Sequence, residues 1–190
     1  MGGDSGGCSR FGYWVLPQLN PHFLFNSLTS LGSLIHIDPK TAARFLDNLS
    51  KTYRYILKSS ERDTVPLAEE LKFAEAFVKL QKTRFGDGFQ VHFNVSEAFF
   101  HRKVVPVTLQ NLIENAVKHN IVDEEMPLEI AVFVDDDCLV VRNNLQRKKF
   151  VDTSNRKGLV HLQSFYQYLS DRKIIIAEDD QFFTIKIPLL

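Results

Sequence analysis

Apolar residues recur at helical spacing over two stretches in the first third of the chain. The first, about residues 16–36, carries an apolar stripe: Leu24, Leu28, Leu31 and Ile35. At about 100° per residue this stripe lies on one side of a helix, and we expect it to be buried. Pro21 lies inside the pattern and predicts a kink, because proline lacks an amide donor and crowds the carbonyl four residues back.

The second stretch, about residues 40–58, follows Asp38-Pro39, which reads as an N-cap and a first-turn proline. Its apolar positions also recur at helical spacing: Ala42, Phe45, Leu46, Leu49, Tyr53, Ile56 and Leu57. Two such helices joined by a short turn predict an antiparallel hairpin. Because one hairpin cannot cover both stripes, we expect two copies to pair as a four-helix bundle, which makes the protein a homodimer.

After a polar linker at about residues 59–64, helical and alternating patterns mix. The expected helices cover about residues 66–84, 107–119 and 159–169, and the expected strands cover 89–95, 128–134, 139–142, 173–177 and 182–187. This order predicts an α+β chain, with the N-terminal helical hairpin followed by an α/β sandwich whose mixed, antiparallel-rich sheet is covered by helices. The expected divisions are a flexible segment at 1–13, a helical region at 14–62 and a second domain at 63–190.

Composition narrows the function. Of 190 residues, 44% are hydrophobic and 24% charged, so the chain can build a core. Lys plus Arg and Asp plus Glu both number 23, and this balance argues against a nucleic-acid binder but not against binding one nucleotide. Two cysteines form no disulfide framework, and no apolar run approaches the ~18 residues of a membrane span.

His22 stands apart from the apolar stripe. On a helical projection it points nearly opposite to the leucines and shares its face with Gln18, Asn26 and Thr29. A packing histidine would be expected on the leucine side, whereas a reactive imidazole would be expected on this polar strip. The simpler alternative is a hydrogen-bonded surface histidine.

The string around His22 is Pro-His-Phe-Leu-Phe-Asn, and it resembles the phospho-acceptor motif of the LytS-type bacterial sensor histidine kinases. The resemblance implies that His22 attacks the γ-phosphate of ATP, with Asn26 as a neighbour on the acceptor face. The phosphohistidine would then donate to an aspartate on a response-regulator receiver domain. Full-length members commonly carry membrane or sensory segments before this core. We therefore expect a bacterial cytoplasmic fragment of a protein anchored in the inner membrane.

The helix at 109–119 carries a second signal. Asn111, Asn115 and Lys118 share a polar face with Glu114 beside them, which suits a magnesium triphosphate but is also found on ordinary amphipathic helices. The string Leu-Gln-x-Leu-x-Glu-Asn-Ala-x-Lys-His resembles the N box of GHKL ATPases in its LytS form. The resemblance implies ATP and Mg²⁺ as cofactors and a GHKL-type domain. It makes Asn115 the metal ligand and assigns nucleotide contacts to Asn111, Lys118 and His119, with Glu114 supporting the site.

Two other motifs depart from the family. Where members have Asp-x-Gly-x-Gly, this chain has Asn143-Asn144, so the Asn143 amide oxygen would accept the adenine amino group without charge assistance. The glycine-rich lid is reduced to Arg156-Lys157-Gly158-Leu159, in which only Gly158 and Leu159 match as nucleotide contacts. The basic run at 146–149 reads as a solvated loop.

These observations leave two main hypotheses. The first is an active histidine kinase core that autophosphorylates His22. The second is a degenerate pseudokinase that acts as a dimeric, non-catalytic partner of a response regulator, and the altered adenine and lid motifs motivate it. Another GHKL ATPase, such as a chaperone or topoisomerase fragment, lacks a histidine motif like the one around His22.

Overall fold

The computed structural model describes residues 21–59, 61–148 and 157–190, with side chains from Phe23 onward and, after the last gap, from Leu159 onward. The predicted flexible segment at 1–13, the predicted helix start at 16–20 with Gln18, and the basic residues Lys149 and Arg156 lie outside these ranges. The kink expected at Pro21 depends on the residues that precede this proline, and these also lie outside the described ranges. Within the described part, no helix is long and apolar enough to cross a membrane.

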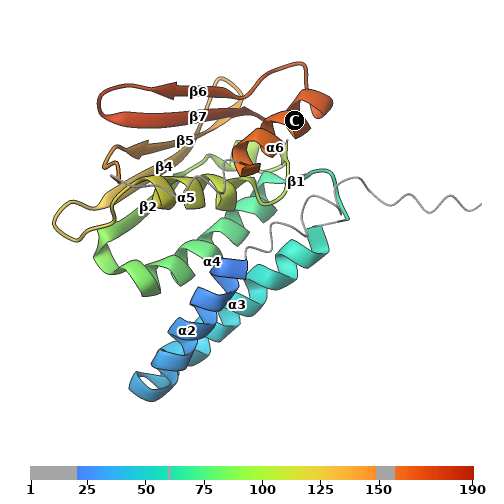
Figure 1. Cartoon of the computed structure of the whole chain (residues 1–190). Coiled ribbons are helices and arrows are strands. Elements are labelled where there is room, and N and C mark those ends of the chain that lie inside the picture. Colours follow the sequence, from blue (N-terminus) through green and yellow to red (C-terminus); the bar gives the residue numbers. More distant parts are fainter. Residues whose placement is uncertain (1–20, 60, 149–156) are drawn as a thin grey trace, which may run out of the picture.

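The predicted hairpin is confirmed. Helix α2 (Pro21–Ile37) and helix α3 (Pro39–Ser59) extend together away from the rest of the molecule (Figure 1). Asp38 separates them as the expected N-cap of α3, because its Oδ1 accepts the amides of Lys40 and Thr41 at 3.1 Å. The hydroxyl of Thr41 donates to Asp38 Oδ2 at 2.6 Å, and this bond is the main cause of a lowered pKa at Asp38.

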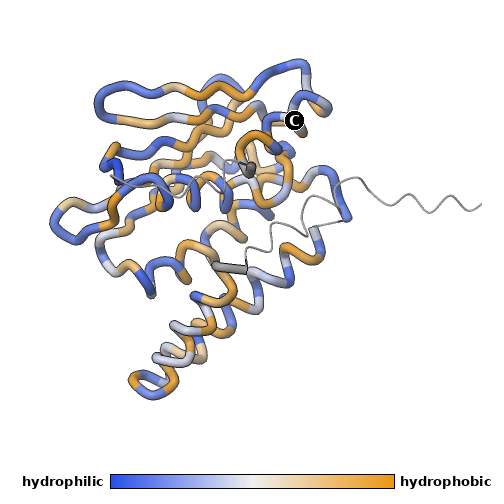
Figure 2. The backbone as a smooth tube through the Cα atoms, in the orientation of Figure 1, coloured by the Kyte–Doolittle hydropathy of each residue, from blue (hydrophilic) through white to orange (hydrophobic). Residues whose placement is uncertain are grey.

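The expected burial of the α2 leucine stripe is wrong within one chain. Leu28 and Ile35 are 48% and 52% exposed, whereas the face of α2 that packs inward is led by Phe23 and Ser27. The Phe23 ring lies 5.3 Å from the ring of Phe77 in the next helix, so an aromatic contact decides which face is buried. Figure 2 shows hydrophobic residues along the hairpin as far as the turn most distant from the sheet.

The second domain is built on a mixed five-stranded sheet, as predicted. Its strand order is β2 (Phe89–Asn94), β4 (Leu128–Asp135), β5 (Cys138–Asn144), β7 (Phe182–Pro188) and β6 (Ile175–Glu178). Only the β2–β4 pairing is parallel among these neighbours. The predicted β4–β5 turn is tight, with Asp136 and Asp137 at φ values of 47° and 56°, which aspartate tolerates better than most residues. A two-residue pair, β1 (Val65–Pro66) with β3 (Lys103–Val104), was too short to predict.

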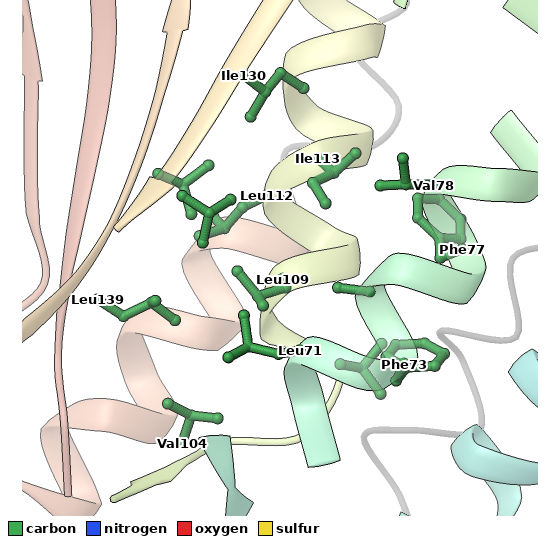
Figure 3. Close-up of a cluster of buried hydrophobic side chains, with 14 of the residues drawn as sticks. Leu71, Phe73, Phe77, Val78, Val104, Leu109, Leu112, Ile113, Ile130 and Leu139 are labelled. Carbon is green, nitrogen blue, oxygen red and sulfur yellow. The ribbon is translucent and has the colours of Figure 1, made fainter. Parts of the chain in front are cut away.

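Three helices accompany the sheet: α4 (Leu67–Phe85), α5 (Thr108–His119) and α6 (Lys157–Leu169), with short 3-10 turns at Gly86–Gly88 and Glu97–Phe99. Figure 3 shows Leu109, Leu112 and Ile113 of α5 between the sheet and α4. All three are buried, as are Ile130 on the sheet side and Phe77 on the α4 side. Helix α5 is therefore the centre of the core, and its position determines where its polar side chains lie.

The Gly88→Ala substitution is expected to destabilise the fold by about 1–3 kcal/mol, because the added methyl group overpacks a backbone contact. A Cβ at Gly88 would lie 2.7 Å from the carbonyl carbon of Asp123 and 2.8 Å from its oxygen. Urea unfolding measures the change. Gly32→Ala is the matched control, because a Cβ there meets nothing within 4 Å and alanine favours the α2 helix. Equal effects of the two substitutions would contradict the overpacking argument.

Candidate active site

A cavity with a volume of about 420 Å³ lies beside helix α5, which is within the usual range for small-molecule sites. Four residues predicted for the nucleotide site line it: Asn115, His119, Asn143 and Leu159. They come from α5, the end of β5 and the start of α6, three elements far apart in sequence. The remaining lining residues are Ala116, Asn120, Leu145, Arg147, Lys148, Val160, Gln163, Glu178 and Phe183.

Other predicted residues lie elsewhere on the described chain. Asn111, Glu114 and Lys118 are half-buried and do not line the cavity. Glu114 accepts a hydrogen bond from Gln110 at 3.2 Å. The pKa of Tyr53 in α3 is raised, first by the burial of Tyr53 and second by the negative charge of Glu114. Glu114 therefore acts on the hairpin side of α5 and not on the cavity side.

For His22 and Gly158, two of the residues predicted for the site, the structure describes only the helix in which each lies. His22 lies in the first turn of α2, and Gly158 lies in the first turn of α6. Asn26, expected on an outward polar strip with His22, is half-buried. It lines a small pocket between the hairpin and α4, together with Gln81 and Arg84.

Asn143 is 3% exposed at the end of β5. Its side-chain amide donates to the carbonyl oxygen of Asn144 at 2.6 Å. An aspartate in the same place would bring a carboxylate oxygen against that carbonyl, so the local backbone favours asparagine here. With its NH₂ group engaged, the amide oxygen of Asn143 is the group suited to accept a hydrogen bond in the cavity.

The basic run is attached to the C-terminal end of α5, a role that charge pattern alone did not indicate. The amide of Gln146 donates to Asn120 Oδ1 at 2.7 Å, and the amide of Lys148 donates to the carbonyl of His119 at 3.1 Å. The Lys148 ammonium donates to the carbonyl of Val117 at 2.9 Å, where a cation complements the helix dipole. Burial, and then the charge of Arg84, lowers the pKa of Lys148. These contacts hold the segment that carries Arg147 and Lys148, so that both side chains line the cavity.

No sequence pattern marked the acidic and aromatic residues of the cavity. Glu178 pairs with Arg147 across the cavity's edge, and Phe183 lies opposite Asn143 in the β5–β7 pairing. Both are in the last two strands, where an alternating pattern does not distinguish a site residue from a packing residue. Among the described residues, no group of three histidine, cysteine or acidic side chains could hold a metal alone. The oxygen-bearing side chains of the cavity suit a Mg²⁺ ion that is bound partly by the protein and partly by phosphate oxygens.

Comparison with known proteins agrees with these features. A family model described as Histidine kinase matches residues 15–89. Sensor protein LytS of Enterococcus faecalis is 38% identical over 102 residues, which cover 54% of this chain and 17% of that protein. Sensor protein kinase HptS of Staphylococcus aureus is 39% identical over 194 residues, which cover 90% of this chain and 37% of that one. The chain is similar to the LytS-type sensor histidine kinases.

These matches confirm the resemblance inferred from the two motifs, and the helical hairpin followed by a mixed sheet with helices confirms the predicted α+β fold class. The chain spans only 17% to 37% of the length of these two relatives. Among solved structures, the cytoplasmic segment of histidine kinase QseC matches 67% of this chain and 78% of that one, with a TM-score of 0.46 and 15% identity.

Since the resemblance assigns the adenine amino group to Asn143, the Asn143→Ala substitution is expected to weaken ATP binding about fivefold, the effect of one lost hydrogen bond. GTP carries an oxygen in place of that amino group, so GTP binding should change less. Calorimetric titration of the parent chain and the variant with both nucleotides checks the prediction. A parallel loss for ATP and GTP would show that Asn143 does not read the adenine.

Proposed function

We propose that this chain is the core of a two-component sensor histidine kinase that binds ATP with Mg²⁺ and autophosphorylates His22. The phosphoryl group would then pass to an aspartate on a response-regulator receiver domain. The observation that carries the proposal is the joint presence of the phospho-acceptor motif on α2 and a cavity lined by Asn115, His119 and Asn143.

The cavity offers groups of the right chemistry for each part of the nucleotide. Asn143 would accept the adenine amino group, and Asn115 would supply an amide oxygen to the metal. Arg147 and Lys148 provide positive charge for phosphates, although Glu178 balances part of it. When bound, Mg²⁺ would neutralise charge that develops on the phosphate oxygens.

In the proposed reaction, a neutral ring nitrogen of His22 attacks the γ-phosphorus. An N–P bond forms as the P–O bond to ADP breaks, and the electron pair leaves with ADP. Positioning and charge neutralisation supply most of the catalysis in phosphoryl transfer. Roles for Asn26, Asn111, Glu114, Lys118, Gly158 and Leu159 remain predictions.

Dimerisation belongs to the same proposal. Apolar residues on the outside of the hairpin would be buried by a second copy of it: Leu28, Ile35, Leu46 and Leu57, each about half exposed. The proposed division between hairpin region and catalytic domain, at residues 62 and 63, falls between the end of α3 and β1. We also propose a cytoplasmic location for this part of a membrane-anchored protein. Light scattering that finds a monomer at high concentration would contradict the dimer.

The test of function is incubation of the purified chain with γ-labelled ATP and Mg²⁺. We expect label that is labile in acid and stable in base, as a phosphoramidate is. A folded dimer that binds no ATP and takes up no label would favour the pseudokinase instead. Label stable in acid would indicate a hydroxyl acceptor and would contradict the proposed chemistry.

A further inference from the structure

Glu70, in the first turn of α4, is a carboxylate buried with 0% exposure. Its oxygens accept from groups that belong to other parts of the fold. Oε1 accepts the amide of Leu109 at 2.8 Å, and Oε2 accepts the amide of Val107 at 3.0 Å. These amides begin helix α5, so Glu70 serves as the N-terminal cap that the sequence of α5 itself lacks.

The residue at this cap has an unusual backbone. Val107 has φ 64° and ψ 11°, in the left-handed region, where a β-branched residue is strained. Its side chain is fully buried, and its amide points to Glu70. Two residues before Val107, the amide of Val105 donates to the hydroxyl of Tyr166 in α6 at 3.2 Å. The start of α5 is thus held in a defined, strained shape by side chains from α4 and α6.

The third contact of Glu70 leads to the hairpin. The hydroxyl of Tyr55, near the end of α3, donates to Glu70 Oε2 at 2.6 Å. The ring of Tyr55 stacks on Phe73 of α4, with centroids 4.1 Å apart. A single carboxylate therefore receives donors from the hairpin on one side and from the helix that carries Asn115 on the other.

We propose that Glu70 is a positioning residue that couples the phospho-acceptor hairpin to the nucleotide site. Through the Tyr55–Glu70 contact, the position of α3 sets the strained start of α5 and so the placement of Asn115 and His119 along that helix. The importance of this coupling for catalysis rests on the proposed kinase function. The coupling itself can be tested without nucleotide.

The energetics favour a specific role over simple packing. A fully buried carboxylate costs free energy that an apolar side chain of similar size would avoid. Here the donors are neutral, and their three hydrogen bonds engage both carboxylate oxygens. Removing the Tyr55 hydroxyl takes away a short bond to this charged acceptor while the stacked ring stays in place.

The first experiment is hydrogen exchange by NMR on the Tyr55→Phe variant of the full chain. Above pH 7, where Glu70 is ionised, we expect about tenfold faster exchange at the amides of Val107 and Leu109, the size of a lost bond to a charged group. Amides of β5 are the internal reference and should accelerate less than those of Val107 and Leu109, because they also respond to any loss of overall stability. Tyr168→Phe is the matched control, because the Tyr168 side chain lies 76% exposed on α6. Unchanged exchange at Val107 and Leu109, or equal acceleration at β5, would overturn the coupling.

The second experiment measures the affinity of ATP with Mg²⁺ for the same variants. Tyr55→Phe should weaken binding several-fold and Tyr168→Phe should not. Faster exchange at α5 with unchanged affinity would overturn the positioning of the nucleotide site. If the parent chain binds no ATP, the proposed function fails, and the exchange experiment still decides whether α3 and α5 are coupled.

Titration of Glu70 with pH is a readout that a purely structural role of this residue would not change. Burial raises the pKa of Glu70 to about 7, against the opposing effect of Tyr55 and the amides of 107–109. The titratable groups that face it are Tyr55 from α3 and Tyr166 from α6, with the Arg62–Glu69 ion pair acting on Tyr55.

Because the pKa of Glu70 is raised in the folded protein, the free energy of unfolding falls as pH rises. Glu70 contributes its full stability below the unfolded value of about 4.3, and this contribution is lost as pH rises through about 7. Glu70→Gln should abolish this decline in the free energy of unfolding. The amide shifts of Val107 and Leu109 should titrate with a midpoint near 7 in the parent chain and stay flat in Glu70→Gln. Flat shifts in the parent chain would overturn the assignment of Glu70 as their acceptor.

Discussion

A His22→Gln variant is expected to bind ATP as tightly as the parent chain and to accept no phosphoryl label. The cavity is built by α5, β5, α6 and the last strands, whereas His22 lies in α2. Removing the nucleophile therefore leaves the nucleotide site intact. Glutamine keeps a polar side chain but has no nucleophilic nitrogen, so we expect a loss of at least about 10³-fold in labelling rate.

The measurement is γ-labelled ATP uptake beside calorimetric titration of ATP on the same preparation. His36→Gln is the matched control, because His36 is an exposed histidine near the other end of α2. Label on His22→Gln at the parent rate would mean that the acceptor lies elsewhere. Loss of both binding and label would mean that His22 supports the fold and would leave its role as acceptor unsupported.

Asn115→Ala is expected to have the next largest effect, with ATP affinity in the presence of Mg²⁺ falling about 10- to 100-fold and labelling falling with it. Asn115 lines the cavity from the middle of α5, and no described cluster of acidic residues could hold the metal in its place. Loss of its amide oxygen removes the proposed protein ligand of Mg²⁺.

Titration with Mg²⁺ and with EDTA separates metal-dependent from metal-independent binding. Asn115→Asp, which keeps an oxygen ligand, should retain most of the metal dependence. Asn111→Ala is the informative comparison, because Asn111 lies one turn earlier on α5 and does not line the cavity. If Asn111→Ala removes the metal dependence and Asn115→Ala does not, the assignment of the metal ligand is wrong.

Local patterns predicted much of the fold. The Asp38 cap, the tight Asp135–Asp137 turn and the alternating strands depend on residues that are near neighbours in sequence, and the structure has each of them. The N-box residues Asn115 and His119 and the strand-end residue Asn143 line one cavity, and their roles in nucleotide binding stay predictions. Such features are predictable because the chemistry that decides them is local or carried by a motif.

Features that depend on distant parts of the chain were not predictable. Helix α2 has two apolar faces. Phe23 is buried against the rings of Tyr53 in α3 and Phe77 in α4, while Leu28 is exposed. A glutamate in the first turn of a helix usually lies at the surface, so nothing local marked Glu70 as buried. Lys148 belonged to a run of cations, and its bond to Val117 depends on how the chain returns to α5.

Helix α5 is fixed along its axis at both ends by polar groups from outside it, Glu70 at the start and the segment with Gln146 and Lys148 at the finish. Its flanks are apolar, and the hydrophobic effect that buries them has no direction of its own, whereas the hydrogen bonds at the two ends do. The residues at the two ends of α5 therefore bear on binding geometry as well as on stability. A change such as Leu112→Ile would mainly alter the melting temperature, whereas changes at either end would also move Asn115 and alter nucleotide affinity.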